Sequence, residues 1–252
     1  MTLLPHISQQ FKGAVWRIEI DQFRDILIAE IRNAEAKTVT FSSVSLDSGE
    51  LNFQELSTPE RWLTGIECIY DGVLLLHYYQ SETGPAHKGL MAVDALTGEI
   101  LWSNFTFGFD RLTADGPLVF DMLMQPRRLF LLDIRTGSTT RIYQPVINAG
   151  PVNYLRLPDQ ISAESLPSDL AAFHPYGNWV HYIEHNNFRI VSLHALKGGQ
   201  LVQLIYVFND DQCVYEDLLN ADIQKIQPEA FIMHKNCLIY IKNKTELKVL
   251  PL

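Results

Sequence analysis

A tight turn that recurs between apolar segments constrains the fold of this chain more than any other feature. The clearest copy, MAVDALTGEILWS (91–103), places Asp-Ala-Leu-Thr-Gly between two such segments. Glycine adopts positive φ without steric cost, so Thr97-Gly98 predicts a hairpin of two antiparallel strands. A hairpin cannot bury its own apolar faces, and it therefore has to pack against other elements.

Four further segments repeat this arrangement. They are VSLDSGELNFQEL (44–56), LLDIRTGSTTRIY (131–143), RIVSLHALKGGQLVQLIYVF (189–208) and a degraded copy, CLIYIKNKTELKVLPL (237–252), which turns near Asn243-Lys244. The turn glycines Gly49, Gly98, Gly137 and Gly198 lie 49, 39 and 61 residues apart. Spacings of about 40 to 50 residues that are built from strands are typical of the blades of a β-propeller.

Two more segments with strand character precede each hairpin. The expected first strands are 14–21, 63–71, 107–115, 151–159 and 222–227, and the expected second strands are 25–33, 72–80, 116–124, 178–186 and 229–236. The sequence therefore predicts an all-β chain, a five-bladed β-propeller of four-stranded antiparallel blades. The blades are expected in a single domain, 1–252, at about 14–56, 63–107, 108–145, 151–208 and 213–252. Six blades with one incomplete are the alternative, because the insertion at 156–175 could hold part of another blade.

The segment GLMAVDALTGEILWS (89–103) resembles the repeat of the pyrroloquinoline-quinone (quinoprotein-like) propellers, whose blades carry an aliphatic–Asp–x-x-Thr-Gly–x–aliphatic–Trp pattern. The chain as a whole resembles small uncharacterised bacterial propeller-like domains. The resemblance implies that the Asp and Gly shape each hairpin and that the Trp packs between neighbouring blades. Those structural roles fall on Asp47, Gly49, Asp94, Gly98, Trp102, Asp133 and Gly137. The resemblance implies a fold and no particular activity.

Composition excludes several classes of partner. The net charge is −9 without any basic run, which argues against binding to nucleic acid or to anionic lipid. No stretch approaches the roughly 20 apolar residues of a membrane-spanning helix. The N-terminus MTLLPHISQQFKG shows no secretion signal, so the expected location is the cytoplasm. Cys68, Cys213 and Cys237 lie far apart and are expected to be buried, reduced thiols.

Polar residues on the expected first strands are candidates for a binding site, because these strands line the central channel of a propeller. The candidates are Arg17, Glu19, Glu67, Asp110, Arg111 and Arg156, together with His174 beside the long insertion. Mixed charge around an axis suits a small polar ligand. It is equally consistent with a charge-balanced lining around ordered water.

A second pattern places ionisable residues at one position of the expected second strands. The sixth residue is Glu30, His77, Asp121 or His234, and only the fourth copy departs, with Ile183. Two acids and two imidazoles suit a divalent ion or acid–base chemistry. However, second strands lie back from the axis, and ligation needs contacts of about 2 Å. The favoured interpretation is that each residue makes a hydrogen bond inside its own blade. No metal ligands and no cofactor are predicted, although a divalent metal or a quinone stays as a less favoured alternative.

These features predict a non-catalytic binding or scaffolding propeller. Its ligand, a protein, a peptide or a small polar molecule, would bind at an axial funnel or at the loops of one mouth. The alternative is a hydrolase that acts on a sugar or phosphate-type substrate through Glu19, Glu67 and Asp110. Glycoside hydrolysis needs two carboxyl groups about 5 to 10 Å apart, so pairing of each carboxylate with an arginine would argue against it. A quinone-dependent oxidoreductase is the third hypothesis.

Overall fold

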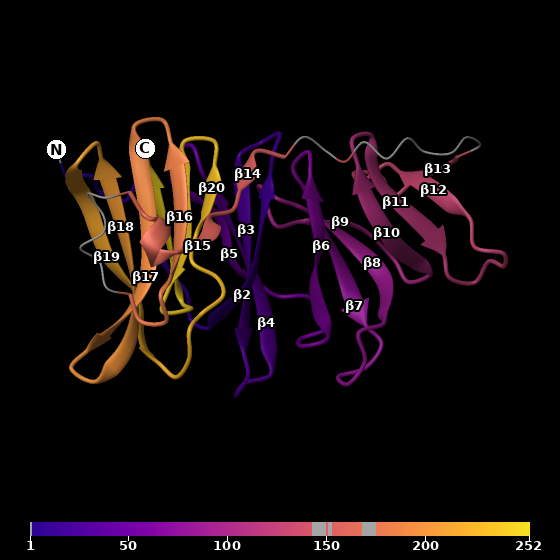
Figure 1. The fold of residues 1–252 in the computed structure, drawn as a ribbon. Coiled ribbons are helices and arrows are strands. Elements are labelled where there is room, and N and C mark those ends of the chain that lie inside the picture. The colour runs from indigo at the N-terminus through magenta and orange to yellow at the C-terminus, as the bar shows by residue number, and fades with distance from the viewer. Residues whose placement is uncertain (1, 143–149, 151–152, 168–174) are drawn as a thin grey trace. The chain divides into compact units, whose positions relative to one another are not determined.

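A computed structural model describes residues 2–142, 150, 153–167 and 175–252. These residues form 22 strands in five antiparallel sheets and one short 3-10 turn, Ala163–Ser165 (Figure 1). The prediction of an all-β chain is therefore confirmed. Among the described residues, no helix has the length and apolar character needed to cross a bilayer. The chain divides into two compact units, Lys12–Asn153 and Met1–Phe11 with Tyr154–Leu252.

The Lys12–Asn153 unit contains three sheets of four strands, each in chain order. The first holds β2 (Ala14–Asp21), β3 (Ile26–Asn33), β4 (Thr38–Ser45) and β5 (Leu51–Leu56). The second holds β6 (Thr64–Tyr70), β7 (Val73–Tyr79), β8 (His87–Asp94) and β9 (Ile100–Asn104), and the third β10 (Phe107–Thr113), β11 (Gly116–Asp121), β12 (Leu129–Leu132) and β13 (Thr139–Arg141). Neighbouring sheets pack face to face. Ile28 of β3 belongs to one apolar cluster with Leu74 of β7, and Leu75 of β7 belongs to another with Val119 of β11.

The second unit contains two sheets of five strands. One holds β15 (Asp159–Ser162), β16 (Trp179–His185), β17 (Phe188–Lys197), β18 (Gln200–Asn209) and β19 (Gln212–Ile223). The other has the order β1 (Ile7–Gln10), β22 (Glu246–Pro251), β21 (Cys237–Lys242), β20 (Ile232–His234) and β14 (Leu155–Arg156). The N-terminal strand β1 thus pairs with the C-terminal strand β22.

Three details of the predicted strand plan are wrong in this unit. Segment 151–159 was expected to begin the fourth sheet, but β14 pairs with β20 in the last sheet and β15 begins the fourth. Segment 222–227 forms no strand beyond the end of β19. Strand β19 was expected to belong to the fifth blade, yet Asp210, with φ 49°, makes a tight turn that folds it back onto β18. Five strands, rather than four, therefore form each of these two sheets.

The predicted hairpin turns lie where the sequence places them. Gly49, Gly98 and Gly137 have φ of 76°, 77° and 75°. The carboxylate of Asp94 accepts hydrogen bonds from the backbone N–H groups of Leu96 and Thr97, both at 3.0 Å. Asp133 does the same in the next sheet with Arg135 and Thr136.

The first hairpin departs from the predicted motif. The acceptor stands four residues before the glycine, and that position is Ser45, whose Oγ accepts from Ser48 N at 3.2 Å. Asp47, which was expected in this role, is exposed at the tip of the turn. This copy keeps the spacing of the turn and has Ser45, rather than an aspartate, at the position that Asp94 and Asp133 occupy in the next two sheets.

An aromatic side chain of one sheet covers the turn glycine of the next sheet in the Lys12–Asn153 unit. Phe53 and Trp102 each stand four residues after their own turn glycine. A Cβ atom at Gly98 would lie 3.3 Å from the Phe53 ring, and one at Gly137 would lie 2.9 Å from the Trp102 ring. Trp102 Nε1 also donates to the carbonyl of Ile134 at 2.8 Å. Trp102 therefore joins the second sheet to the third.

The three thiols do not share one environment. Cys68 is buried, Cys237 is half-buried and Cys213 is exposed. The expectation of buried thiols is therefore wrong for Cys213, which lies on β19, close to its exposed turn with β18.

Candidate functional site

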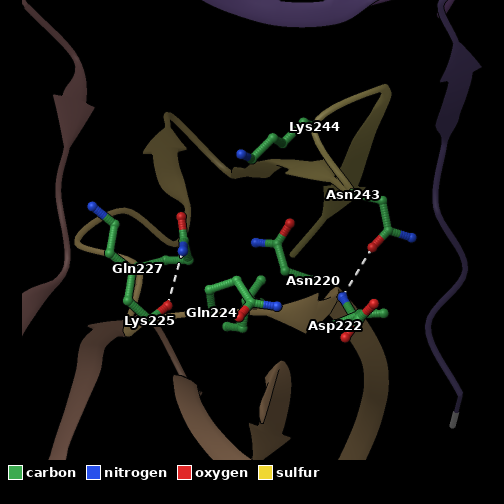
Figure 2. A pocket seen from close by; sticks show the side chains of 9 residues that line it. Asn220, Asp222, Gln224, Lys225, Gln227, Asn243 and Lys244 are labelled. Atoms are coloured by element: carbon green, nitrogen blue, oxygen red, sulfur yellow. Dashed lines mark hydrogen bonds between the residues drawn. The ribbon is translucent and has the colours of Figure 1, made fainter. Parts of the chain in front are cut away.

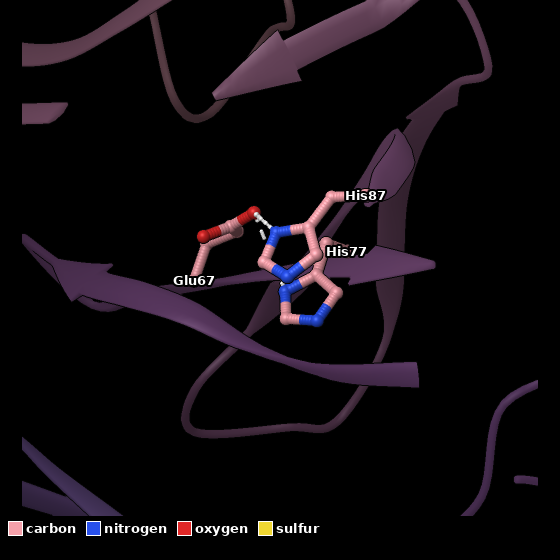
Figure 3. A group of neighbouring side chains, drawn as sticks. All are labelled: Glu67, His77 and His87. Atoms are coloured by element: carbon pink, nitrogen blue, oxygen red, sulfur yellow. Dashed lines mark hydrogen bonds and ion pairs between the residues drawn. The ribbon is translucent and has the colours of Figure 1, made fainter. Parts of the chain in front are cut away.

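Glu67, His77 and His87 bring one carboxylate and two imidazoles together on the second sheet (Figure 3). They come from the neighbouring strands β6, β7 and β8. Glu67 Oε1 lies 2.7 Å from His87 Nδ1 and 3.3 Å from His77 Nδ1. The two imidazole rings stack, with centroids 3.5 Å apart and an interplanar angle of 6°. One donor atom from each residue lies within 4.8 Å of the others.

A β-bulge positions Glu67. Ile66 pairs with Leu76 and Cys68 pairs with Leu75, so that Glu67 has no partner residue on β7. Such an extra residue bends its strand and redirects its side chain. Each first strand of this unit carries a bulge: Trp16 is the extra residue of β2, and Asp110 is the extra residue of β10.

A second bulge brings His87 to the same face of the sheet as His77. His77 pairs with Leu90, but Tyr78 pairs with Lys88, which leaves Gly89 as an extra residue on β8 with φ 62°. Without it, alternation would place His87 on the opposite face. Room for the His77 ring comes from Gly65 on β6, where a Cβ atom would lie 3.0 Å from His77 Nε2.

The three side chains differ in their access to solvent. The exposed fraction is 3% for His77, 9% for Glu67 and 36% for His87. Neither ring nitrogen of His77 makes a hydrogen bond, despite the short approach of Glu67 to Nδ1. A buried polar atom without a partner costs about 1–3 kcal/mol. His77 is therefore a buried polar group that the described part of the protein does not satisfy.

Burial and charge set the protonation states of this group. Burial alone would raise the pKa of the Glu67 carboxyl, but His77 and His87 together outweigh it and hold that pKa below its ordinary value. Burial lowers the pKa of the His77 imidazole, and the attraction of Glu67 does not reverse this. At neutral pH the carboxylate is therefore ionised and His77 is neutral.

The charged residues around the group are already paired with one another. Glu30 Oε1 accepts from Arg32 Nε at 2.7 Å, and its Oε2 accepts from Ile66 N at 3.1 Å. Arg17 pairs with Glu19 at 2.6 Å and donates to the carbonyl of Glu67 at 3.2 Å. These two ion pairs add no net charge beside the three side chains.

The predicted binding residues separate into several places. Arg17, Glu19 and Glu67 come together on β2 and β6, as just described. Asp110 forms ion pairs with Arg111 at 2.6 Å and with Arg127 at 2.5 Å. In the second unit, Arg156 donates to the carbonyl of Glu184 and contacts His185 Nδ1. His174 lies outside the described residues.

The four residues at the shared second-strand position do not behave alike. Asp121 accepts from Leu123 N at 2.9 Å and so bonds within its own sheet, as predicted. Glu30 accepts from Arg32 of its own strand, as predicted, and also from Ile66 N of the next sheet. Neither ring nitrogen of His77 makes a hydrogen bond, so the expectation is wrong for this residue. Sequence reasoning missed His87 entirely, and the only available signal was Gly89, since a glycine inside a strand marks a bulge.

A separate pocket of 380 Å³ lies in the second unit (Figure 2). It is lined by Asn220, Ala221, Asp222, Ile223, Gln224, Lys225, Gln227, Asn243 and Lys244. Its amides hold local turns, since Asn243 Oδ1 accepts from Ala221 N and Gln227 Nε2 donates to the carbonyl of Lys225. None of the lining residues is buried, so this pocket holds no preformed polar group comparable with His77.

The family described as Domain of unknown function (DUF4905) matches residues 20–102, the segment that carries Glu67, His77 and His87. No curated protein matches the sequence.

Solved structures that resemble the chain include β-propellers. The β-propeller domain of the Trilobed protease from Pyrococcus furiosus is 10% identical, with 94% of this chain and 65% of that chain covered and a TM-score of 0.34. A eukaryotic initiation factor is 12% identical, with coverage of 97% and 53% and a TM-score of 0.34. Oligogalacturonate lyase in complex with manganese is 11% identical, with coverage of 100% and 92% and a TM-score of 0.32. The chain thus spans less than two thirds of the first two, and similarity at this level says nothing about activity.

Proposed function

We propose that the chain is a five-bladed β-propeller that acts as a non-catalytic binding protein and that it binds a divalent transition metal ion, Zn²⁺ in the first place, through Glu67, His77 and His87. The observation that carries this proposal is the buried His77, whose two ring nitrogens have no hydrogen-bond partner beside a carboxylate and a second imidazole. The five antiparallel sheets and the repeated turn support the blades.

The donor set favours zinc over the hard cations. Zn²⁺ binds imidazole nitrogen and carboxylate oxygen, whereas Ca²⁺ and Mg²⁺ take oxygen ligands. Ligation would give the buried ring of His77 the partner that it lacks. A metal ion lies in the plane of each imidazole that binds it, so the stacked rings have to separate. His87, with 36% of its side chain exposed, has the freedom to turn.

The neighbouring carboxylates favour binding over hydrolysis. A two-carboxylate mechanism needs free carboxyl groups. Glu19 and Asp110, two of the three expected catalytic acids, are held by arginines. Glu30 accepts hydrogen bonds on both of its oxygens and offers no free base. A cytoplasmic location and a protein, peptide or small polar partner stay predictions within this proposal.

Zinc titration of the metal-free full chain tests the site. Calorimetry should show one Zn²⁺ per chain, and Glu67→Gln, His77→Gln and His87→Gln should each weaken binding at least tenfold, because even residues that only support metal ligands contribute about 10- to 100-fold. His234→Gln is the matched control, since His234 shares the strand position of His77 and is equally buried, at 2% exposure. His87→Gln alters a half-exposed side chain and leaves the core intact. Absence of binding, or wild-type affinity in all three variants, would overturn the site.

A further inference from the structure

The three donors leave a metal ion short of one ligand. Zn²⁺ in proteins is almost always four-coordinate, and sites with three protein ligands take the fourth from outside. Among the described histidines, cysteines and acids, only Glu67, His77 and His87 share this cluster. Cys68, the residue after Glu67, belongs to the apolar cluster between the second and third sheets. Glu30, a further acid, lies beside Gly65 like His77, and both of its oxygens are engaged.

The exposure of the three side chains indicates the open direction. Glu67 and His77 are almost covered, whereas more than a third of His87 reaches solvent. A ligand from solution would therefore approach beside His87. The ring of Tyr79 stands edge-on to both imidazoles, with centroids 4.6 Å from His77 and 5.1 Å from His87. This aromatic ring flanks the approach and gives it an apolar border.

The charge balance selects the chemical class of that ligand. An ion of charge +2 bound by one carboxylate and two neutral imidazoles keeps one unit of positive charge. The two surrounding ion pairs, Arg17 with Glu19 and Arg32 with Glu30, each have no net charge. They therefore do not neutralise the remaining positive charge of the ion. A partly buried positive charge favours a negatively charged donor over a neutral one, since interactions are stronger away from bulk water.

We infer that the metal ion at Glu67, His77 and His87 keeps one coordination position open to solvent beside His87 and binds a carboxylate ligand there. This inference rests on the proposed metal site and adds the ligand class that the site recognises. Carboxylate oxygen is an ordinary ligand of Zn²⁺, and the apolar border formed by Tyr79 suits the hydrocarbon part of an organic acid.

Cobalt spectroscopy tests the inference on the full chain. Co²⁺ reports its coordination through visible absorption, and we expect acetate to change the spectrum of the Co²⁺-loaded protein saturably, with one site per chain. Acetamide, the neutral analogue of the same shape, should leave the spectrum unchanged. A response to acetamide equal to that of acetate would overturn the choice of an anion. A Co²⁺ spectrum that acetate does not alter would overturn the open position, whereas failure of Co²⁺ to bind would overturn the metal site itself.

A charge variant separates recognition of the anion from binding of the metal. Arg17→Gln removes the partner of Glu19 and leaves a negative charge near the ion, so acetate affinity should fall severalfold while Co²⁺ stays bound. Arg24→Gln is the matched control, because Arg24 forms a comparable exposed ion pair with Asp71 in the same unit, at 2.9 Å. Equal acetate affinity in both variants would overturn the charge argument.

Discussion

The contact between Trp102 and the turn at Gly137 provides a direct test of how the second and third sheets are joined. Gly137 has φ 75°, and a Cβ atom there would lie 2.9 Å from Trp102 Cδ2. The indole cannot withdraw freely, because its Nε1 donates to Ile134 O. We therefore expect Gly137→Ala to destabilise the Lys12–Asn153 unit by two separable effects, backbone strain and steric overlap.

The size of each effect follows from the geometry. A residue with a Cβ atom in the left-handed region costs about 1–2 kcal/mol. Forcing extra volume into a packed contact costs about 1–3 kcal/mol more. Gly72→Ala isolates the first effect, because Gly72 lies in the same unit with φ 79° and its nearest neighbour, an Arg135 Nη2 atom, is at an ordinary 3.6 Å. The difference between the two variants should therefore be about 1–3 kcal/mol.

Urea unfolding followed by far-ultraviolet circular dichroism measures both free energies. Adding Trp102→Leu to Gly137→Ala should restore most of the unfolding free energy that is lost through steric overlap. The double-mutant cycle should then show a coupling energy of the same size. Equal losses of unfolding free energy in Gly137→Ala and Gly72→Ala, with no coupling to Trp102, would refute the conclusion that the indole packs tightly against this turn.

Three further outcomes are expected. Burial, with a contribution from His181, lowers the pKa of His194 from 6.5 to about 4, so the unfolded chain binds a proton that the folded chain does not. The contribution of His194 to stability should be complete above pH 6.5, and its loss should lower stability by at most about 3 kcal/mol as the pH falls towards 4. His194→Gln should flatten this part of a pH-dependent unfolding series, and an unchanged slope would contradict it. Asp94→Ala should cost about 1–2 kcal/mol in urea unfolding, because two N–H groups lose their acceptor, and an unchanged unfolding free energy would contradict this. Zn²⁺ at about 100 times its dissociation constant should stabilise the protein by about 2.7 kcal/mol, and His87→Gln should reduce this stabilisation to about 1.4 kcal/mol or less at the same Zn²⁺ concentration in thermal unfolding.

Local patterns were sufficient to predict the hairpins of the fold. Strand β2 (Ala14–Asp21) has the bounds that alternation indicates, and Gly98 turns the chain where Thr-Gly stands. Such features depend on a few neighbouring residues, whose conformational preferences act before any tertiary contact forms. The strand pairs of the Lys12–Asn153 unit follow directly, because each strand there pairs with the next one along the chain.

Pairing between distant segments was not predictable in the same way. Leu155 pairs with His234, and Ile7 pairs with Val249 at the other end of the chain. The sequence of a two-residue strand such as Leu155–Arg156 contains no periodicity that could identify its partner. An open strand edge offers unpaired N–H and C=O groups to any segment that reaches it, so the partner of so short a strand depends on the tertiary fold.

The candidate site was hidden for a related reason. Glu67 and Asp110 occupy the same bulged position, three residues before the ends of β6 and β10. Asp110 is neutralised by arginines, whereas Glu67 faces imidazoles. In the described part of this unit, only the second sheet has a further bulge between its second and third strands, at Gly89, and this bulge turns His87 towards His77. The repeat therefore specifies the common scaffold, and the site arises where one copy departs from it. A search for further sites in such chains should begin with glycines that interrupt a strand, because a single inserted residue can unite side chains that alternation would keep on opposite faces.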